Sequence, residues 1–359
     1  MFKKIITAVA SAAVVAGVLL AAPANAAGVT LAGGGSSFAN GMLTACAASY
    51  TNNTVSYTKS SSGTGRSSYA NSTFQYAASD GTYAGTETFS GANGTRYVTV
   101  PLLGGPVVFA YSAVGVNDGL KLTPAIVSGI FKGTITRWDD AALKELNPKV
   151  KLPKKAIKVA YRTSGSGTTG NLVNYLNQTV GASWTKNSAN DLVAAAGGSG
   201  SFATNSSSYA NSQLLAAYIE DNANAFGYFD LSDAVTADVG IAALQNAAGA
   251  YVMPTASAAA KFISAQTPLT TATDNLQGTL AIDFTKVIPG AYQLSIVTYG
   301  VAPRFTGTGK STDASKLAVQ DFFNYVVKTC VPAKAASLGY VALGGALKTS
   351  ALNQIKLIG

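Results

Sequence analysis

A short strand that leads through a small-residue loop into a helix is the feature that most restricts what this chain can fold into. The apolar run from residue 159 ends at Arg162, a loop of Gly, Ser and Thr extends to Gly170, and Leu172 and Leu176 follow at helical spacing. The first turn of such a helix offers unpaired backbone N–H groups and the positive end of the helix dipole. With hydroxyl groups and a guanidinium beside it, the segment predicts an oxyanion site. A Ser-capped helix with Arg162 in a surface ion pair explains the same residues.

Two further small-residue loops precede predicted helices. A glycine-rich loop at residues 33–35 leads to a helix that we expect Ser36 or Ser37 to cap. Residues that repeat every four positions form the expected buried face of this helix: Phe38, Met42, Cys46 and Tyr50. A similar loop at residues 59–66 precedes a possible helix through Tyr69 and Ala70. Three hydroxyl-rich helix starts are more than helix capping requires, so together they favour a binding site over capping alone.

Strands and helices alternate along the chain, which is the pattern of an α/β protein. The predicted strands include residues 98–111, 224–229 and 293–301, and the predicted helices include residues 124–132, 212–220, 255–263 and, as the last, 312–327. Gly104, Gly105 and Pro106 interrupt the first strand, and we interpret this break as a crossing between domains. Residues 186–209 are rich in Gly, Ser, Ala and Asn and predict a long variable loop.

The absence of histidine excludes most hydrolase mechanisms. No Ser-His-Asp or Cys-His arrangement can form, and zinc sites built on imidazole are excluded. The net charge of +9 suits anionic ligands, but the basic residues are scattered and do not alternate with aromatic residues, so we expect no nucleic-acid binding. Cys46 and Cys330 are the only cysteines, and in an exported protein we expect them to form a disulfide.

The first 26 residues have the features of a secretory signal peptide. Lys3 and Lys4 precede an apolar run, and Ala24-Asn25-Ala26 is a small-residue cleavage site. No cysteine follows that site, so we do not expect a lipid anchor, and no later segment predicts a membrane span. We therefore expect an exported protein, either in the periplasm or outside the cell.

Two motifs considered singly are weak. Asp80 ends the apolar run of residues 74–79, and an Asp that caps a turn would look the same. Residues 307–312 resemble the end of a phosphate-binding P-loop, but its first glycine would fall at Arg304. We therefore do not expect nucleotide binding.

The order of the motifs resembles the phosphate-binding proteins of bacterial high-affinity phosphate ABC transporters. The motifs that carry the resemblance are Ser37-Phe38 after a Gly-rich start, Ser62-Gly-Thr-Gly65, Ala78-Ser-Asp80, Ile130-Phe-Lys-Gly-Thr-Ile-Thr-Arg-Trp138 and Arg162-Thr-Ser-Gly-Ser-Gly-Thr168. The resemblance extends from about residue 31 to 230, with weaker support in residues 292–327.

The resemblance implies a two-lobed, type II periplasmic-binding-protein fold of the α/β class. Two mixed sheets flanked by helices would be joined by two hinge crossings. Residues 27–104 and 293–359 would form the first lobe, residues 105–292 the second, and residues 1–26 the signal peptide. We expect a monomer.

The resemblance also implies the binding residues. Ser37 and Phe38 would supply a hydroxyl and a backbone N–H, Ser62 a second hydroxyl, and Asp80 the lone acceptor. The other lobe would close the site with four residues: Arg162, Ser166, Gly167 and Thr168. No catalytic residue, metal or cofactor is expected.

One position departs from the family pattern. Members of this family commonly have Asp two residues after the arginine, where it holds the guanidinium, and this chain has Ser164. Arg162 would keep more of its charge for the ligand but lose this support, so affinity and selectivity could differ from the family norm.

The resemblance implies a receptor that captures hydrogen phosphate and delivers it to the ABC permease in the membrane. Phosphate near neutral pH carries a proton that sulfate lacks, so a buried Asp80 could accept a hydrogen bond from phosphate and repel sulfate, although not arsenate. One alternative is a secreted surface or adhesive protein that retains the scaffold without transport. A phosphatase-like enzyme is a third interpretation, disfavoured by the missing histidine and the lack of an activated nucleophile.

Overall fold

The computed structural model describes residues 28–81, 96–269, 278–309 and 311–359. The predicted signal peptide, residues 1–26, and the surface loop predicted for residues 86–95 lie outside these ranges. Within the described residues, no helix combines the length and apolar character needed to cross a membrane.

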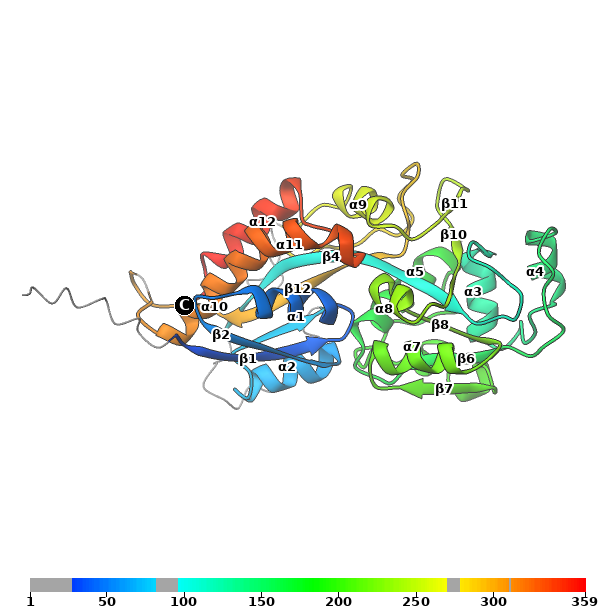
Figure 1. Ribbon diagram of the computed structural model, residues 1–359, viewed down its shortest axis with the longest axis horizontal. Helices are drawn as coiled ribbons and strands as arrows, with labels where there is room; N and C mark the ends of the chain where they lie inside the picture. The colour runs from blue at the N-terminus through cyan, green and yellow to red at the C-terminus, as the bar shows by residue number, and fades with distance from the viewer. Residues whose placement is uncertain (1–27, 82–95, 270–277, 310) are drawn as a thin grey trace, which may run out of the picture.

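A nine-stranded mixed sheet runs through the elongated molecule (Figure 1), and its strands follow the order β2-β1-β3-β12-β4-β8-β6-β7, with β9 also beside β4. These strands are β1 (Thr30–Ser36), β2 (Thr54–Ser60), β3 (Tyr76–Ser79), β4 (Tyr97–Tyr111), β6 (Lys158–Arg162), β7 (Ser206–Tyr209), β8 (Ala225–Asp230), β9 (Gly240–Ile241) and β12 (Ser295–Pro303). A separate three-stranded sheet contains β5 (Lys121–Leu122), β10 (Ala243–Gln245) and β11 (Tyr251–Val252).

Strand β4 joins the two halves of the large sheet. Its residues 97–106 pair with β12 and its residues 107–111 pair with β8. Figure 1 shows this long strand crossing from one half of the molecule to the other. Each half is mixed, because β1, β2 and β3 pair in parallel, as do β6, β7 and β8, whereas β12 and β4 run antiparallel to their neighbours.

The predicted interruption of β4 at residues 104–106 is wrong, because the strand is continuous and buried over its whole length. Pro106 pairs with Ser295 at the end of the β12 register, where the neighbour of β4 changes to β8. A missing N–H at this change of partner removes no bond from the middle of a ladder. The break in the sequence therefore marks the crossing, as expected, without breaking the strand. The lobe boundaries themselves stay a prediction.

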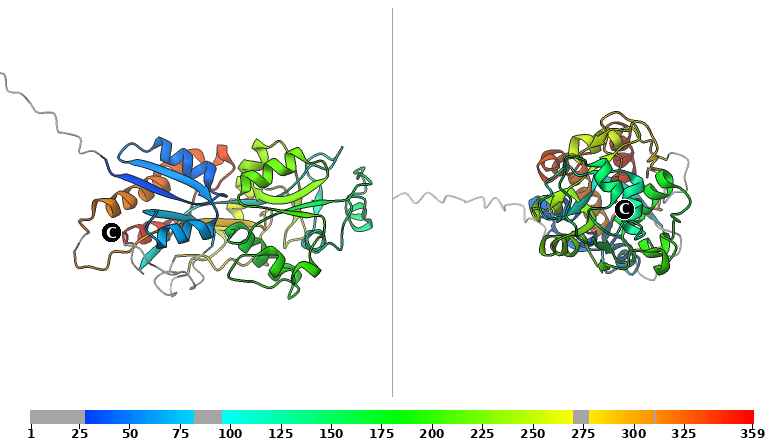
Figure 2. Two further views of the ribbon diagram at one scale, coloured as in Figure 1. Left: turned by 90° about the horizontal axis from the view of Figure 1, so that it is seen from below. Right: turned by 90° about the vertical axis from the view of Figure 1, so that its right-hand side faces the viewer.

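Helices flank the sheet on both faces (Figures 1 and 2). They are α1 (Asn40–Ser49), α2 (Ser62–Ala70), α3 (Pro124–Phe131), α4 (Ala141–Leu146), α5 (Gly167–Val180), α6 (Leu192–Ala195), α7 (Ser212–Asp221), α8 (Leu231–Thr236), α9 (Ala256–Ser264), α10 (Ala314–Tyr325), α11 (Val331–Lys334) and α12 (Gly345–Ile355). The repeat predicted for the first helix is confirmed, since Phe38, Met42, Cys46 and Tyr50 are all buried. This amphipathic face packs α1 against the sheet.

Residues 186–209 are not one long loop. They contain α6, a 3₁₀ turn at Ser199–Ser201 and β7, which pairs in parallel with β6. The four residues of β7 are Ser-Ser-Ser-Tyr, none of them buried, because this strand forms the edge of the sheet. An edge strand with little to bury lacks the apolar signal by which strands are recognised.

The helix predicted for residues 312–327 is not the last. After α10 comes a π-helical turn, Val326–Cys330, then α11 and α12. Leu347, Ala351 and Ile355 are the buried apolar residues of α12, and their spacing of four was visible in the sequence. Cys46 and Cys330 form a disulfide with 5.6 Å between their Cα atoms, which ties α1 to the π-helical turn.

Candidate functional site

The functional residues expected from the sequence converge where the two halves of the molecule meet. Ser37 follows β1, Asp80 follows β3 and Arg162 ends β6, while Ser62 and Gly167 begin α2 and α5. The carboxyl ends of parallel strands in both halves face the same junction, a common position for ligand sites in α/β proteins. The two small-residue loops touch directly, since the Gly63 N–H donates to the Gly165 carbonyl at 2.9 Å.

Asp80 is a buried carboxylate surrounded by hydroxyl groups, and it is only 3% exposed. Its Oδ1 accepts hydrogen bonds from Ser36 at 2.6 Å and Thr298 at 2.7 Å. Its Oδ2 is held more loosely, by Thr168 at 3.2 Å and Ser62 at 3.5 Å. Oδ2 is therefore the oxygen with more room to accept a further hydrogen bond at the junction.

Burial raises the pKa of the Asp80 carboxyl, and hydrogen bonds from Ser36, Thr298 and Thr168 and the charge of Arg162 offset part of that rise. Burial of a carboxylate is costly unless donors satisfy it, and the hydroxyl groups here do so without adding charge. The positive charge of the site is therefore supplied by the guanidinium of Arg162.

Arg162 is 2% exposed and is held by hydrogen bonds from both halves. Its Nη1 donates to Ser37 at 2.9 Å and to Ser212 at 3.2 Å, and its Nη2 donates to the Ala210 carbonyl at 2.8 Å. Its buried Nε has no hydrogen-bond partner within the described part of the chain. Burial lowers the pKa of Arg162, and nearby Tyr228 and Asp80 act in the opposite direction. A buried cation with an unsatisfied donor is the state expected of an anion-binding arginine.

The Asp expected at position 164 is absent, and other groups hold the Arg162 guanidinium. Ser164 is exposed, and the described hydrogen bonds of the Arg162 guanidinium go to other residues. The segment ahead of α7 supplies the Ala210 carbonyl and the Ser212 hydroxyl instead. Sequence reasoning missed Ser212, although the helix start at residue 212 was predicted and is confirmed by α7.

Thr168 and Gly167 lie against Asp80 at the start of α5. A Cβ at Gly167 would clash with the Ser62 hydroxyl and come within 2.9 Å of Asp80 Cβ, so only glycine allows this approach. Asn171 joins the two elements, because its Nδ2 donates to the carbonyls of Asp80 at 2.7 Å and Gly167 at 2.9 Å.

Ser166 and Phe38, two of the expected binding residues, contact other parts of the protein in this conformation. The Ser166 hydroxyl accepts the Thr169 N–H at 3.2 Å and caps α5. The Phe38 ring packs against Tyr340, whose hydroxyl donates to the Phe38 carbonyl at 2.8 Å. The predicted capping of α1 is wrong: its N-cap residue is Ala39. Instead, the Ser36 hydroxyl donates to the Asp80 carboxylate and the Ser37 hydroxyl accepts from the Arg162 guanidinium. Two adjacent serines therefore contact the two charged groups of the site.

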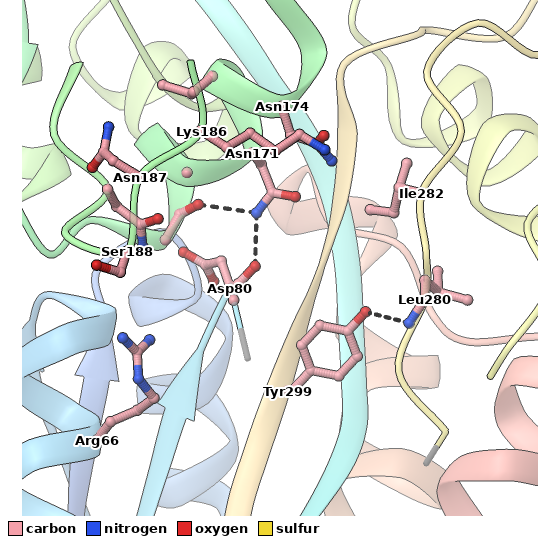
Figure 3. A pocket seen from close by; sticks show the side chains of 15 residues that line it. Arg66, Asp80, Asn171, Asn174, Lys186, Asn187, Ser188, Leu280, Ile282 and Tyr299 are labelled. Carbon is pink, nitrogen blue, oxygen red and sulfur yellow. Dashed lines mark hydrogen bonds between the residues drawn. The ribbon is translucent and has the colours of Figure 1, made fainter. Parts of the chain in front are cut away.

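A cavity of about 430 Å³ opens beside Asp80, between the two halves (Figure 3). Among the residues that line it are Arg66 on α2, Gly167 and Asn171 on α5, Lys186, and Tyr299 on β12. The cavity reaches the outer side of the Asp80 cluster, and the bonds from Asn171 form part of its wall.

A second pair of carboxyl groups, Asp230 and Asp233, lies behind the Ser37 loop. The Asp230 Oδ1 accepts the Asp233 N–H at 2.9 Å, and among the described residues its Oδ2 has no partner. The side chain of Gln213 connects the pair to the site, donating to Asp233 at 2.6 Å and to the Ser37 carbonyl at 3.3 Å. Burial, and next the neighbouring Asp233, raise the pKa of Asp230 well above its ordinary value.

We expect the variant Asp230→Asn to be more stable than the natural chain at alkaline pH. Because the pKa of Asp230 is raised on folding, its contribution to stability is complete at low pH and is lost as the pH rises through the raised pKa. The amide avoids this loss, so the advantage of the variant in the free energy of unfolding should grow as the pH rises from about 4 to about 8. Urea unfolding at both pH values measures it, with exposed Asp221→Asn as control. Equal pH dependence in all three proteins would contradict the assignment.

The comparisons with known proteins agree with this geometry. A family model described as the PBP superfamily domain matches residues 21–329. The phosphate-binding protein PstS of Xylella fastidiosa is 32% identical over 212 residues, which are 57% of this chain and 52% of that protein. PstS of Methanocaldococcus jannaschii is 27% identical over 283 residues, 74% of this chain and 69% of that protein. The chain thus spans about half the length of the first curated relatives it matches.

Solved structures share the fold at low sequence identity. A high-affinity periplasmic phosphate-binding protein bound with phosphate superposes with a TM-score of 0.69 at 18% identity, covering 89% of this chain and 92% of that chain. A phosphate-binding protein from Stenotrophomonas maltophilia superposes with a TM-score of 0.67 at 19% identity, covering 90% and 93%. At this identity the likeness establishes the two-lobed α/β architecture alone.

Proposed function

Because this chain belongs to the PBP superfamily, we propose that it is an exported receptor that captures hydrogen phosphate between its two halves and delivers it to an ABC permease. The observation that carries the proposal is that one carboxylate and one guanidinium are both buried at a junction of hydroxyl-rich loops. Asp80 and Arg162 face the same junction from opposite halves, each nearly fully buried. Both named curated relatives are phosphate-binding proteins, which supports the choice of ligand.

In the proposed complex, the anion lies between the Asp80 cluster and the Arg162 cluster. Arg162 contributes charge through Nη1 and the unsatisfied Nε, and the hydroxyl groups of Ser37, Ser62 and Thr168 turn from their present partners to the anion. Backbone N–H groups at the starts of α2 and α5 complete the set of donors. Charge-assisted bonds of this kind replace the hydration of the anion.

Selection among anions is assigned to Oδ2 of Asp80. Its two bonds, at 3.2 Å and 3.5 Å, are the longer ones of the carboxylate, so this oxygen can accept a hydrogen bond from the protonated oxygen of hydrogen phosphate. Sulfate has no proton to donate and would face a like charge in a site without water, which disfavours it. Arsenate is also protonated and would not be rejected in this way.

Capture requires the two halves to separate, because the loops touch in the present conformation. The Gly63–Gly165 hydrogen bond and the hydrogen bond from Arg162 to Ser37 both cross the junction. Opening would use the two hinge crossings expected from the sequence, one at residues 104–106 of β4 and one in residues 293–301, which include most of β12. The lobe boundaries, residues 27–104 with 293–359 and residues 105–292, belong to this proposal, as do the permease partner, export, the lack of a lipid anchor and the monomeric state.

The proposed role requires no covalent chemistry. No cluster of metal-ligating side chains occurs in the described ranges. No contact or surface in the described residues favours the alternative of a surface adhesin.

Isothermal titration calorimetry with phosphate, sulfate and arsenate tests the proposal. The chain from residue 27 onward would first be freed of bound anion by unfolding and refolding. We expect phosphate and arsenate to bind with a Kd of about 1 µM or below, corresponding to about −8 kcal/mol, and sulfate to give no heat. A folded protein that binds none of the three anions would overturn the proposal.

The variant Asp80→Asn should lose the discrimination against sulfate. Its carbonyl can keep the bonds from Ser36 and Thr298, while the amide nitrogen replaces Oδ2 and donates where the acid accepted. We expect phosphate to bind about 10- to 100-fold more weakly and sulfate to become measurable, because the acceptor has become a donor. The same titrations check this, and unchanged selectivity would remove Asp80 from its proposed role. Exposed Asp221→Asn serves as the control for the charge change.

A further inference from the structure

We propose that Gln213 is a positioning residue of the phosphate site, which orients the peptide group between Ser37 and Phe38 from the opposite half of the molecule. The inference rests on the proposed function, since the N–H of that peptide group is one of the expected ligands of the anion. Gln213 lies in the first turn of α7, a helix that packs on β6 and β8. It is not among the residues that the sequence resemblance implies.

The Gln213 amide bridges two acceptors. Its Nε2 donates to the Asp233 carboxylate at 2.6 Å and to the Ser37 carbonyl at 3.3 Å. A carbonyl and an ionised carboxylate can only accept, so the NH2 group and not the oxygen of the amide faces them. The Oε1 atom is buried and has no partner within the described ranges. This orientation is therefore kept although it leaves an acceptor unsatisfied.

The hydrogen bond to the Ser37 carbonyl also acts on the Phe38 N–H. The two groups belong to one planar trans peptide, in which the N–H points away from the C=O. A donor that fixes the carbonyl on the side of α7 therefore fixes the direction of the N–H on the other side. Hydrogen bonds in a chain polarise one another, so the same donor makes the N–H a stronger donor to an anion.

The start of α7 holds the side chain of Ser37 as well as its carbonyl. The Ser212 N–H donates to the Ser37 hydroxyl oxygen at 3.0 Å, and the two hydroxyl oxygens lie 3.1 Å apart. Two adjacent residues of α7 thus fix residue 37 at two points across the junction. Because these contacts exist only while the halves are closed, we expect Gln213 to slow the release of a captured anion rather than to speed its capture.

The acid pair behind the loop anchors the amide in turn. Asp233 lies on α8, and its N–H donates to the Asp230 carboxylate at 2.9 Å. The Tyr340 hydroxyl donates to the Phe38 carbonyl at 2.8 Å and lies 3.4 Å from Asp230 Oδ1. The carbonyl groups before and after the Phe38 Cα are therefore both held by side chains that contact the acid pair.

Release of radiolabelled phosphate, chased with unlabelled phosphate, tests this role in Gln213→Leu, in the chain from residue 27 onward. Loss of one hydrogen bond should raise the dissociation rate about 3- to 10-fold and leave the association rate within about twofold of normal. The NMR shift of the Phe38 amide nitrogen in the phosphate-saturated protein should also move, since resonance couples the C=O and N–H of one peptide. A residue that only stabilised the fold would change neither quantity.

The matched control is Gln320→Leu on α10. This glutamine is also half-buried, and its Nε2 donates to the carbonyls of Ile355 and Ile358, each at 3.0 Å. Its loss removes the same kind of hydrogen bonds away from the junction, so phosphate release and the Phe38 signal should not change. Gln213→Asn, which is one methylene shorter and cannot keep both hydrogen bonds, serves as the second variant if Gln213→Leu does not fold.

Titration of the natural chain with phosphate comes first and separates the two ideas. Absence of phosphate binding there rejects the proposed function, and this role with it. Normal binding by the natural chain, together with release at the natural rate from the folded Gln213 variant, rejects the role of Gln213 alone. Faster release with an unmoved Phe38 signal also rejects it, because the effect would not then pass through this peptide group.

Discussion

Replacement of Arg162 by methionine is expected to weaken phosphate binding by roughly 10²- to 10³-fold. Removal of one partner from a buried set of charges costs about 3–5 kcal/mol, and here the lost partner is the guanidinium that donates to Ser37. Methionine fills a similar volume without charge, so the chain should still fold. Calorimetric titration with phosphate measures the loss, and a thermal melt confirms that the variant is folded.

Two controls separate charge from geometry at this position. Arg162→Lys keeps the charge but not the planar fork that reaches Ser37, Ser212 and Ala210, so its affinity should be intermediate. The variant Arg137→Gln removes an exposed arginine whose ion-pair partner is Asp139 rather than a residue of the proposed site. It should bind phosphate normally. Phosphate affinity within about threefold of normal in folded Arg162→Met would show that the guanidinium is not a ligand.

Loss of the disulfide between Cys46 and Cys330 should lower the free energy of unfolding by about 2–5 kcal/mol. The bond closes a loop with a sequence separation of 284 residues, so it restricts the unfolded chain strongly. It ties α1 to the C-terminal π-helical turn, whereas the phosphate site is built from other contacts. Phosphate affinity should therefore change little.

Urea unfolding with and without reductant compares the two states in the same sequence, and Cys46→Ala with Cys330→Ala provides a permanently open form. Equal unfolding midpoints for the oxidised and reduced protein would contradict the stabilising role. A loss of phosphate affinity in the folded double variant would instead indicate that the disulfide positions the Ser37 loop through α1.

Local patterns predicted those parts of the fold that depend on neighbours in sequence. Thr123 caps α3, and Ser166 caps α5, because capping needs a side-chain oxygen and an N–H three residues on. The buried repeat of α1 followed from a spacing of four. The strand β7 was missed because an exposed edge strand of serine has no apolar alternation, and its identity depends on pairing with β6.

The binding residues divide in the same way. Asp80 and Arg162 were expected from their positions at the ends of strands and from the resemblance, and the structure places both at the junction. Thr298 and Ser212 were not expected, since their partners lie 218 and 175 residues away in sequence. No local pattern marks a hydroxyl whose partner is brought near only by the complete sheet. The role of each residue toward a ligand stays a proposal.

A crystal structure of the protein with phosphate tests the central claim most directly. The account predicts a phosphate between the two halves, with one of its oxygens about 2.5–2.7 Å from Asp80 Oδ2 and others bonded to the Arg162 guanidinium and the hydroxyl groups of Ser37, Ser62 and Thr168. Phosphate found only in the cavity beside Arg66 and Lys186, with Asp80 still bonded to Ser62 and Thr168, would contradict it.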